Sequence, residues 1–261
     1  MKQLKFWMVA FTLLMGVSFT SCLDSEEGEV YNVQGWTIVD SYMGYVTFKD
    51  AVGNVYTPTQ ASLTQFETEN KVKISDYKMG FVVGKTVEPE TGAKTTNFTF
   101  TLKAFRPLIY ANAVVAPTKE EMDAAAPENS PVRTLNLGMQ RGMFNKDILV
   151  LPISWRLQND VEKLKLHKLA LACALDEIEE GDTELVFYVR HDNGGDDKSE
   201  VYYSDMYAYN IQYALHSFEA KTGKLPTKLV IKAHETGDYA TNEMPTAYTD
   251  YTVEYKVASA N

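Results

Sequence analysis

The chain has 261 residues, with 35 acidic and 25 basic side chains, so its formal net charge is −10 at neutral pH. Nucleic-acid binding needs a basic surface, so this charge argues against a nucleic-acid partner and against electrostatic adhesion to an anionic membrane. Hydrophobic residues make up 45 % of the chain, which is typical of a globular protein, and the length suits one large or two small domains.

Residues 1–21 have the pattern of a signal peptide. Lys2 and Lys5 give a positive start, and residues 6–19 form an apolar stretch that is too short for a membrane span. Residues 19–22 read Phe-Thr-Ser-Cys, which resembles a bacterial lipobox, with Phe19 where leucine is usual. The resemblance implies that Cys22 is lipidated with acyl chains such as palmitate and becomes the new amino terminus. The alternative is an ordinary cleaved signal peptide with a chance cysteine.

An acidic tether, residues 22–34, follows the lipobox. Its acidic side chains resemble the surface-export signal of Bacteroidetes lipoproteins, and the alternative is a plain solvated tether. The export-signal candidates are Asp24, Glu26, Glu27 and Glu29. Removal of the signal leaves 23 basic against 35 acidic residues, a net charge of about −12. We therefore expect a protein of the outer membrane, anchored only by lipid at Cys22 and exposed on the cell surface.

The chain has two cysteines. If Cys22 is acylated, Cys173 has no partner for an intrachain disulfide. Cys173 lies in the apolar run 169–175 and has no cationic neighbour that would make it a nucleophile. The sequence predicts a small, buried hydrophobic side chain.

Alternation of apolar and polar residues predicts β-strands along most of the chain. It is clearest at 203–215 and 251–257, where tyrosine, valine, isoleucine and leucine recur at every second position. The other expected strands are residues 35–41, 45–50, 71–84, 96–106, 148–157, 184–191 and 228–234. Turn-forming residues occur at 50–54, 88–92 and 192–195.

Residues 161–178 allow two interpretations. Their composition favours a helix, but their apolar residues alternate, with a change of phase at His167 and Lys168. We favour a strand with a bulge or break there, because a one-residue slip turns every side chain to the other face. A similar change of phase between Ile74 and Tyr77 predicts a bent strand.

The alternation stops between residues 110 and 133, where three prolines and four acidic residues lie in 116–131. A short helix capped by Thr118, with Glu121 three residues later, can form there. We expect an all-β protein of two domains, with a small β-barrel domain of about five strands at 35–117, a linker at 118–131 and an antiparallel β-sandwich at 132–261. The sandwich is expected to be antiparallel because its strands lack the long helices that a parallel sheet needs.

Several segments resemble the NigD-like lipoproteins of Bacteroidetes. They are residues 36–40, 45–58, 148–155, 185–196, 229–238 and 251–256, in the context of the lipobox and the acidic tether. The resemblance covers nearly the whole mature chain and implies an N-terminal OB-like barrel with a C-terminal β-sandwich. It implies no defined biochemical activity; the family name comes from a bacteriocin locus.

The densest polar cluster is residues 190–197. The carboxylates of Asp192, Asp196 and Asp197 are suitable calcium ligands, but their spacing does not match an EF-hand loop. Asn193, Gly194 and Gly195 are typical of a tight β-hairpin. We predict a hairpin here and no metal site.

No spacing of residues predicts a catalytic site. The four histidines are scattered, and the sequence has no metalloprotease, serine-hydrolase or phosphate-loop motif. We predict a protein that is not an enzyme and has no cofactor. One alternative is left open, namely a catalytic site whose residues are far apart in the sequence and come together only in the folded protein.

Ten of the 16 tyrosines follow Leu185. Their alternation predicts that most fill the core of the second domain. Tyr202 and Tyr239 fall outside this pattern, so they are the candidates for exposure and for ligand binding.

Together these features predict a non-catalytic lipoprotein of the cell envelope that presents a binding surface to an unknown protein or glycan. The first alternative is a glycan-binding accessory lipoprotein, which an open groove lined by tyrosine or tryptophan would favour. The second is an envelope hydrolase, which two carboxylates or a histidine–acid pair in a deep pocket would favour.

Overall fold

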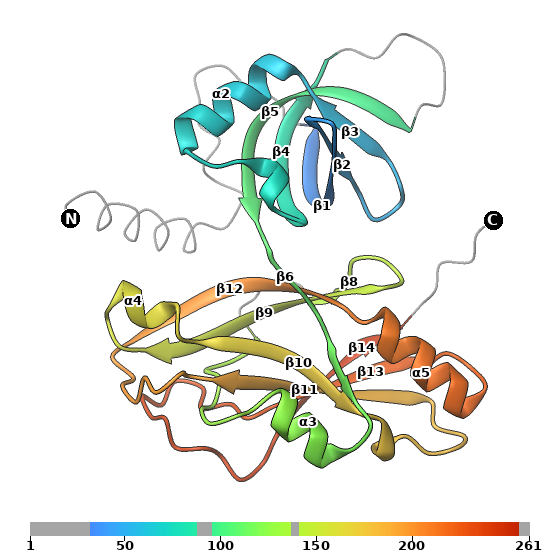
Figure 1. The fold of residues 1–261 in the computed structure, drawn as a ribbon, viewed down its shortest axis with the longest axis vertical. Coiled ribbons are helices and arrows are strands. Elements are labelled where there is room, and N and C mark those ends of the chain that lie inside the picture. The colour runs from blue at the N-terminus through green and yellow to red at the C-terminus, as the bar shows by residue number, and fades with distance from the viewer. Residues whose placement is uncertain (1–31, 88–95, 137–140, 256–261) are drawn as a thin grey trace.

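The structure, a computed structural model, describes residues 32–87, 96–136 and 141–255. It has a β-barrel domain beside a two-layer β-sandwich, which confirms the predicted all-β class (Figure 1). Cys22 and the export-signal candidates lie outside the described residues, and Val33 and Gln34, expected at the end of the tether, belong to the first strand, β1. Within them, no helix is both long and apolar enough to cross a membrane.

The N-terminal domain is a closed barrel with the strand order β1-β2-β3-β5-β4. A helix, α2, lies between β3 and β4, and β3 and β5 pair in parallel. This is the arrangement of an OB-fold, as predicted. The elements are β1 (Val33–Tyr42), β2 (Tyr45–Lys49), β3 (Val55–Pro58), α2 (Gln60–Asn70), η1 (Ile74–Asp76), β4 (Met79–Thr86) and β5 (Asn97–Pro107).

The helix α2 was not predicted, and it shortens the expected strand at 71–84. Thr59 caps its first turn by accepting a hydrogen bond from the Ser62 amide, and Lys71 ends it in the left-handed conformation. Residues 74–76 then form a 3-10 turn, η1. The change of phase between Ile74 and Tyr77 therefore marks this turn and not a bend within a strand, and β4 begins at Met79. The barrel instead curls at a register shift between Val83 and Gly84. A Cβ at Gly84 would lie 2.5 Å from the Thr101 carbonyl oxygen, so only glycine fits.

The C-terminal domain stacks a five-stranded sheet, β14-β13-β11-β10-β7, on a four-stranded sheet, β6-β12-β9-β8. The elements are β6 (Ile109–Asn112), β7 (Val114–Ala116), α3 (Lys119–Ala125), β8 (Gly142–Met143), β9 (Ile148–Leu157), α4 (Val161–Leu164), β10 (Lys168–Ala174), η2 (Leu175–Glu177), β11 (Glu184–Asp192), β12 (Val201–Asn210), α5 (Gln212–Thr222), β13 (Lys228–Ala233) and β14 (Thr249–Glu254). The largest apolar core fills the space between the two sheets and includes Trp155, Phe187 and Tyr209.

The sandwich is mixed and not wholly antiparallel. Three strand pairs are parallel, namely β7–β10, β6–β12 and β11–β13. The last of these needs a crossover, which includes β12 and α5. We predicted a continuous strand to Leu215, but the chain forms a helix from Gln212. Leu215 and Phe218 are buried on one face of α5 and Tyr213 is exposed. In a helix, side chains three or four residues apart share a face, whereas in a strand every second side chain does.

Residues 161–178 combine both interpretations of the sequence. The first part is a helical turn, α4, and the second part is the predicted strand, β10. The break falls between Leu164 and Lys168, next to the change of phase in the sequence. Cys173 of β10 is buried as predicted, and burial raises the pKa of its thiol to about 12, so it is not a reactive nucleophile.

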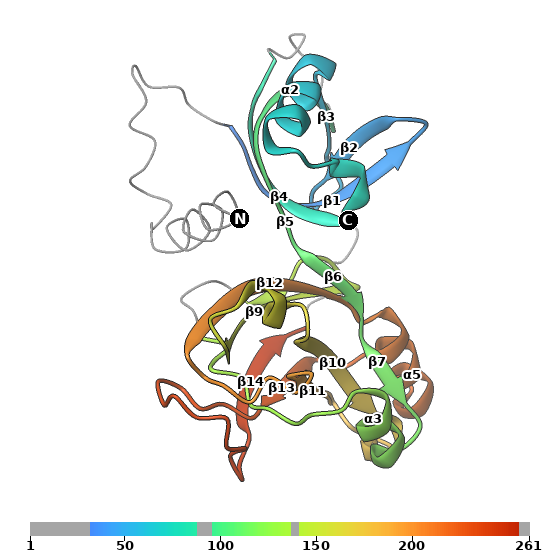
Figure 2. The same ribbon diagram turned by 60° about the vertical axis from the view of Figure 1, so that its left-hand side comes forward.

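The predicted linker at 118–131 is part of the sandwich domain. β5 leads directly through Leu108 into β6 and β7, which pair with sandwich strands, so the barrel ends at Pro107 and not at residue 117 (Figure 2). The predicted helix forms as α3, with the expected cap from Thr118 to the Glu121 amide. It packs on β7 and β10, and Met122 is fully buried.

The two domains share an apolar interface. Met79 of the barrel packs with Leu108 and with Ile148, Val150 and Met206 on the outer face of the four-stranded sheet. Arg106 at the end of β5 adds an ion pair, with its guanidinium Nη2 3.2 Å from a carboxylate oxygen of Asp205 in β12. Burial raises the pKa of Asp205, and Arg106 acts against that rise. The contacts hold the barrel against the sandwich.

Residues 118–131 are therefore not the exposed linker that the sequence predicts. We expect this segment to resist trypsin in the soluble form, residues 23–261, because cleavage needs local unfolding of α3. A Met122→Asp substitution, which buries a charge, should make Lys119 a rapid cleavage site. Peptide mass mapping over time measures both. Rapid cutting at Lys119 in the unsubstituted protein would contradict the packing of α3.

Candidate functional site

An open cleft of about 620 Å³ lies between the two domains. This volume is within the range of small-ligand sites, and such sites often lie at domain interfaces. The barrel contributes Trp36 of β1 and the β2–β3 turn, residues 50–52. The sandwich contributes the remaining lining residues, Arg141, Gly142, Met143, Phe144, Val150, Val253 and Glu254.

Trp36 forms the aromatic part of the cleft. It is partly exposed, and its ring meets Phe81 edge to face at a centroid distance of 4.9 Å. The opposite wall is apolar where Met143, Phe144 and Val150 line it. The cleft therefore has an indole surface that can contact an apolar face of a ligand.

The turn at one edge of the cleft is fixed by Asp50. Its carboxylate accepts hydrogen bonds from the amides of Val52 and Asn54, at 3.0 and 2.8 Å, and from the Asn54 side chain. These contacts occupy the oxygens of Asp50, so its part in the cleft is to shape the turn.

Arg141 supplies a cation at the cleft. Its guanidinium carbon lies 4.4 Å from the centre of the Tyr251 ring, and the Tyr251 hydroxyl donates to Glu235 at 2.7 Å. Burial and Glu235 raise the pKa of Tyr251 to about 12, so the hydroxyl stays protonated. Among the described residues Arg141 has no ion pair within 4.0 Å. Its hydrogen-bond donors can therefore bind a ligand.

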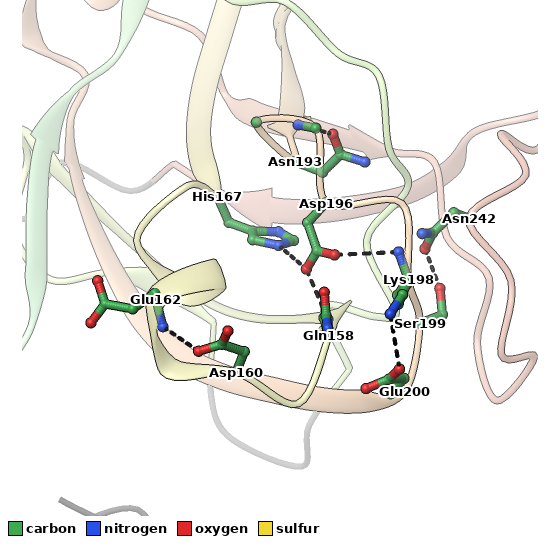
Figure 3. Close-up of polar contacts among 12 residues, drawn as sticks. Gln158, Asp160, Glu162, His167, Asn193, Asp196, Lys198, Ser199, Glu200 and Asn242 are labelled. Carbon is green, nitrogen blue, oxygen red and sulfur yellow. Dashed lines mark hydrogen bonds and ion pairs between the residues drawn. The ribbon is translucent and has the colours of Figure 1, made fainter. Parts of the chain in front are cut away.

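The described residues that line the cleft include no histidine, cysteine or serine. The histidine–acid pair that the fold does assemble lies elsewhere: His167 Nε2 is 3.2 Å from Asp196, and both side chains are only 1 % exposed (Figure 3). His167 Nδ1 is 2.8 Å from His191 Nε2, and His191 Nδ1 is 2.9 Å from the Pro131 carbonyl oxygen. This chain of contacts closes one end of the sandwich and is sealed from substrate.

The predicted hairpin at 192–195 needs a correction. Gly194 and Gly195 do adopt the left-handed conformation of a turn, but β11 and β12 belong to different sheets, so the loop crosses between layers. A Cβ at Gly194 would meet the Leu166 carbonyl oxygen at 2.6 Å, so this crossing requires glycine.

The three aspartates of this loop do not converge. Asp196 points inward and accepts from the amides of Gln158 and Lys198, Asp192 accepts from Asn129 and Gly194, and Asp197 is exposed. Sequence reasoning placed Asp196 with the loop and missed its partner His167, because 29 residues separate them.

The predicted exposure of Tyr202 and Tyr239 is confirmed, at 59 % and 79 %. Neither lines the interdomain cleft, and their part in ligand binding stays a prediction. Trp36, Arg141 and Glu254 were not predicted as site residues. Trp36 lies in one of the family-like segments, but an alternating apolar residue of a strand gives no sign that it faces a cleft.

These features define a class of protein in which an OB-like barrel and a β-sandwich enclose a cleft between them. No protein-family model and no curated protein matched the chain in sequence. Three solved structures from Bacteroidetes share its architecture. The first, from Bacteroides fragilis and assigned as a lipoprotein, is 26 % identical, with 87 % of this chain and 99 % of that chain covered and a TM-score of 0.70.

The second, a DUF1344 protein of unknown function from Bacteroides vulgatus, is 11 % identical, covers 87 % of this chain and 92 % of that chain, and has a TM-score of 0.57. The third, a NigD-like immunity protein from Bacteroides caccae, is 12 % identical, covers 85 % and 94 %, and has a TM-score of 0.50. The chain has the fold of the NigD-like proteins, so the predicted resemblance is confirmed. None of the three descriptions names an enzymatic activity.

Proposed function

We propose that this protein is a non-catalytic lipoprotein of the outer membrane, anchored through acyl chains on Cys22, which presents the interdomain cleft to a ligand outside the cell. The observation that carries the proposal is the cleft itself, which combines Trp36 with the cation of Arg141 and whose described lining includes no histidine, cysteine or serine. The likeness to a structure assigned as a lipoprotein supports the anchor.

The ligand class that the cleft favours is a glycan, so the second candidate function is a glycan-binding accessory lipoprotein. A partly exposed tryptophan can stack on the apolar face of a sugar ring, and Arg141 and Glu254 can bond with its hydroxyl groups. The hydrolase alternative has less support. The His167–Asp196 pair is buried outside the cleft, and of the two carboxylates in the lining, Asp50 and Glu254, that of Asp50 is held by hydrogen bonds within its own turn.

Tryptophan fluorescence can test the cleft directly. The soluble form, residues 23–261, keeps only Trp36 and the buried Trp155, so a ligand in the cleft should change the emission of Trp36. We expect at least one neutral oligosaccharide in a panel of gluco-, xylo-, manno- and galacto-oligosaccharides to give a saturable change.

Trp36→Ala should weaken that binding about tenfold or more, as expected for loss of an aromatic anchor. Isothermal titration calorimetry measures the affinity of this variant, and Tyr213→Ala, an exposed aromatic on α5, is the matched control. If no oligosaccharide binds, the glycan assignment fails. If one binds and Trp36→Ala has no effect, the cleft is not the site.

A further inference from the structure

A second polar site lies at the Leu157 end of β9, away from the cleft. Arg156 of β9 donates from Nη2 to the Asp238 carbonyl oxygen at 3.0 Å. Arg133 Nη2 lies 2.7 Å from the Asp238 carboxylate. Two of the five arginines in this acidic chain therefore meet on one loop residue.

These guanidinium groups are only partly satisfied. The Nε atoms of Arg133 and Arg156 are both buried and have no hydrogen-bond partner among the described residues. The side chain of Asp238 is 94 % exposed, so the ion pair that it makes with Arg133 contributes little to stability. A carboxylate from outside the protein can take its place at small cost, because Arg binds carboxylates with two parallel hydrogen bonds.

An exposed tyrosine packs against the arginines. Tyr202 lies directly across from Arg156 in the β9–β12 pairing, and the Arg133 guanidinium carbon is 4.7 Å from the centre of its ring. Tyr239, which is also exposed, follows Asp238 in a turn in which its amide donates to the Thr236 carbonyl oxygen. Two guanidinium groups beside the exposed ring of Tyr202, with Tyr239 next to Asp238 in the chain, match a sugar that carries a carboxylate.

We propose that Arg133, Arg156, Tyr202 and Tyr239 bind a uronic-acid unit of an acidic glycan, and that Asp238 competes with the ligand carboxylate for Arg133. The arginines bind the carboxylate and the tyrosines contact the apolar face of the sugar ring. This site is separate from the cleft and does not require the cleft to bind a glycan. The local pair of cations is what allows a protein with a net charge of −10 to accept an anionic sugar.

The test uses residues 23–261 and a panel of galacturonate, glucuronate and alginate oligosaccharides, with neutral oligosaccharides of the same length for comparison. We expect one uronate series to bind, with an affinity that falls as salt increases, and no neutral series to bind at this site. Arg156→Gln should weaken binding at least tenfold. Asp238→Asn should strengthen it severalfold, because it removes the competing carboxylate from a fully folded, exposed position. Tyr213→Ala should change nothing.

Calorimetry measures the affinities, and amide chemical shifts locate the bound sugar. Failure of every uronate to bind would overturn the proposal, as would weaker binding by Asp238→Asn. An acidic peptide that binds as tightly as the uronate would show that the surface accepts proteins, which overturns the glycan assignment. Loss of uronate binding in Trp36→Ala but not in Arg156→Gln would place the sugar in the cleft, which supports the proposed function and excludes this second site.

Discussion

An Asp196→Ala variant is expected to lose about 3–4 kcal/mol of unfolding free energy at neutral pH, the usual cost of removing one partner from a buried charged pair. The substitution leaves His167 without its carboxylate and the amides of Gln158 and Lys198 without an acceptor. Urea denaturation measures the change. Asp197→Ala removes the adjacent, exposed carboxylate and should alter stability by no more than about 0.5 kcal/mol.

The hydrogen-bond pattern explains why Asp196 carries so much stability. The Pro131 carbonyl oxygen can only accept, so we assign the proton of His191 to Nδ1. His191 Nε2 then accepts from His167 Nδ1, and donation from His167 Nε2 to Asp196 as well requires both ring nitrogens of His167 to carry a proton, so the pair with Asp196 is an imidazolium and a carboxylate. Each hydrogen bond in this buried series of side chains therefore depends on its last acceptor, the Asp196 carboxylate. An equal, small effect of Asp196→Ala and Asp197→Ala would contradict this assignment.

The same series of hydrogen-bonded side chains predicts that the protein is less stable in acid. Burial lowers the pKa of His191 to about 4, although the Pro131 carbonyl acts against that shift. The unfolded chain therefore binds a proton near pH 6.5 that the folded protein does not bind until near pH 4. Stability is full above pH 6.5 and falls by up to about 3 kcal/mol as the pH drops to 4.

Asp196 adds a loss of the same sign at lower pH. Burial alone would raise its pKa, but hydrogen bonds from Gln158, His167 and Lys198 outweigh burial and lower it. Its contribution is present above the unfolded value of 3.8 and is lost as the pH falls through the folded value. Unfolding free energies measured from pH 7 to 4 should show the slope from His191, and His191→Asn should remove it. A flat profile in the unsubstituted protein would mean that His191 is not buried as a neutral ring.

A Cys22→Ala variant is expected to move from the membrane fraction to the soluble fraction without loss of fold. The proposed acyl chains on Cys22 are the only attachment that the sequence predicts, and a few acyl chains are enough for a stable anchor. Cys173→Ala is the matched control, because Cys173 is buried and should leave the protein in the membrane. Metabolic labelling with a palmitate analogue should fail for the Cys22 variant alone. A Cys22 variant that stays with the membrane would refute the lipoprotein proposal.

The acidic tether can be tested in the same cells. Replacement of Asp24, Glu26, Glu27 and Glu29 by alanine should leave the protein lipidated but protected from protease added to whole cells. Replacement of Ser25 and Gly28 by alanine is the control and should leave it accessible. Continued cleavage of the acidic-tether variant would remove the export signal from the proposal and would leave the anchor untouched.

Local patterns in the sequence were enough to predict most strands. β9 begins and ends at the predicted residues 148 and 157, and the cap of α3 from Thr118 forms as expected. The helix α5 was missed because it follows directly on a strand and its apolar residues also fit a period of two over a short stretch, and no element was predicted at residues 60–70, where α2 forms. The chain forms a helix from Gln212 because this buries Leu215 and Phe218, and that burial depends on tertiary packing.

Patterns within the sequence were sufficient to predict the all-β class, a small N-terminal barrel, the burial of Cys173 and the exposure of Tyr202 and Tyr239. These follow from composition and periodicity, which act between residues close together in the chain. Contacts that form only in the folded protein place β6 and β7 in the sandwich, bring His167 to Asp196, and put Trp36 and Arg141 in the lining of one cleft between the domains. Each of these depends on contacts between residues far apart in sequence. Strand pairing and domain packing bring such residues together, and local propensity does not.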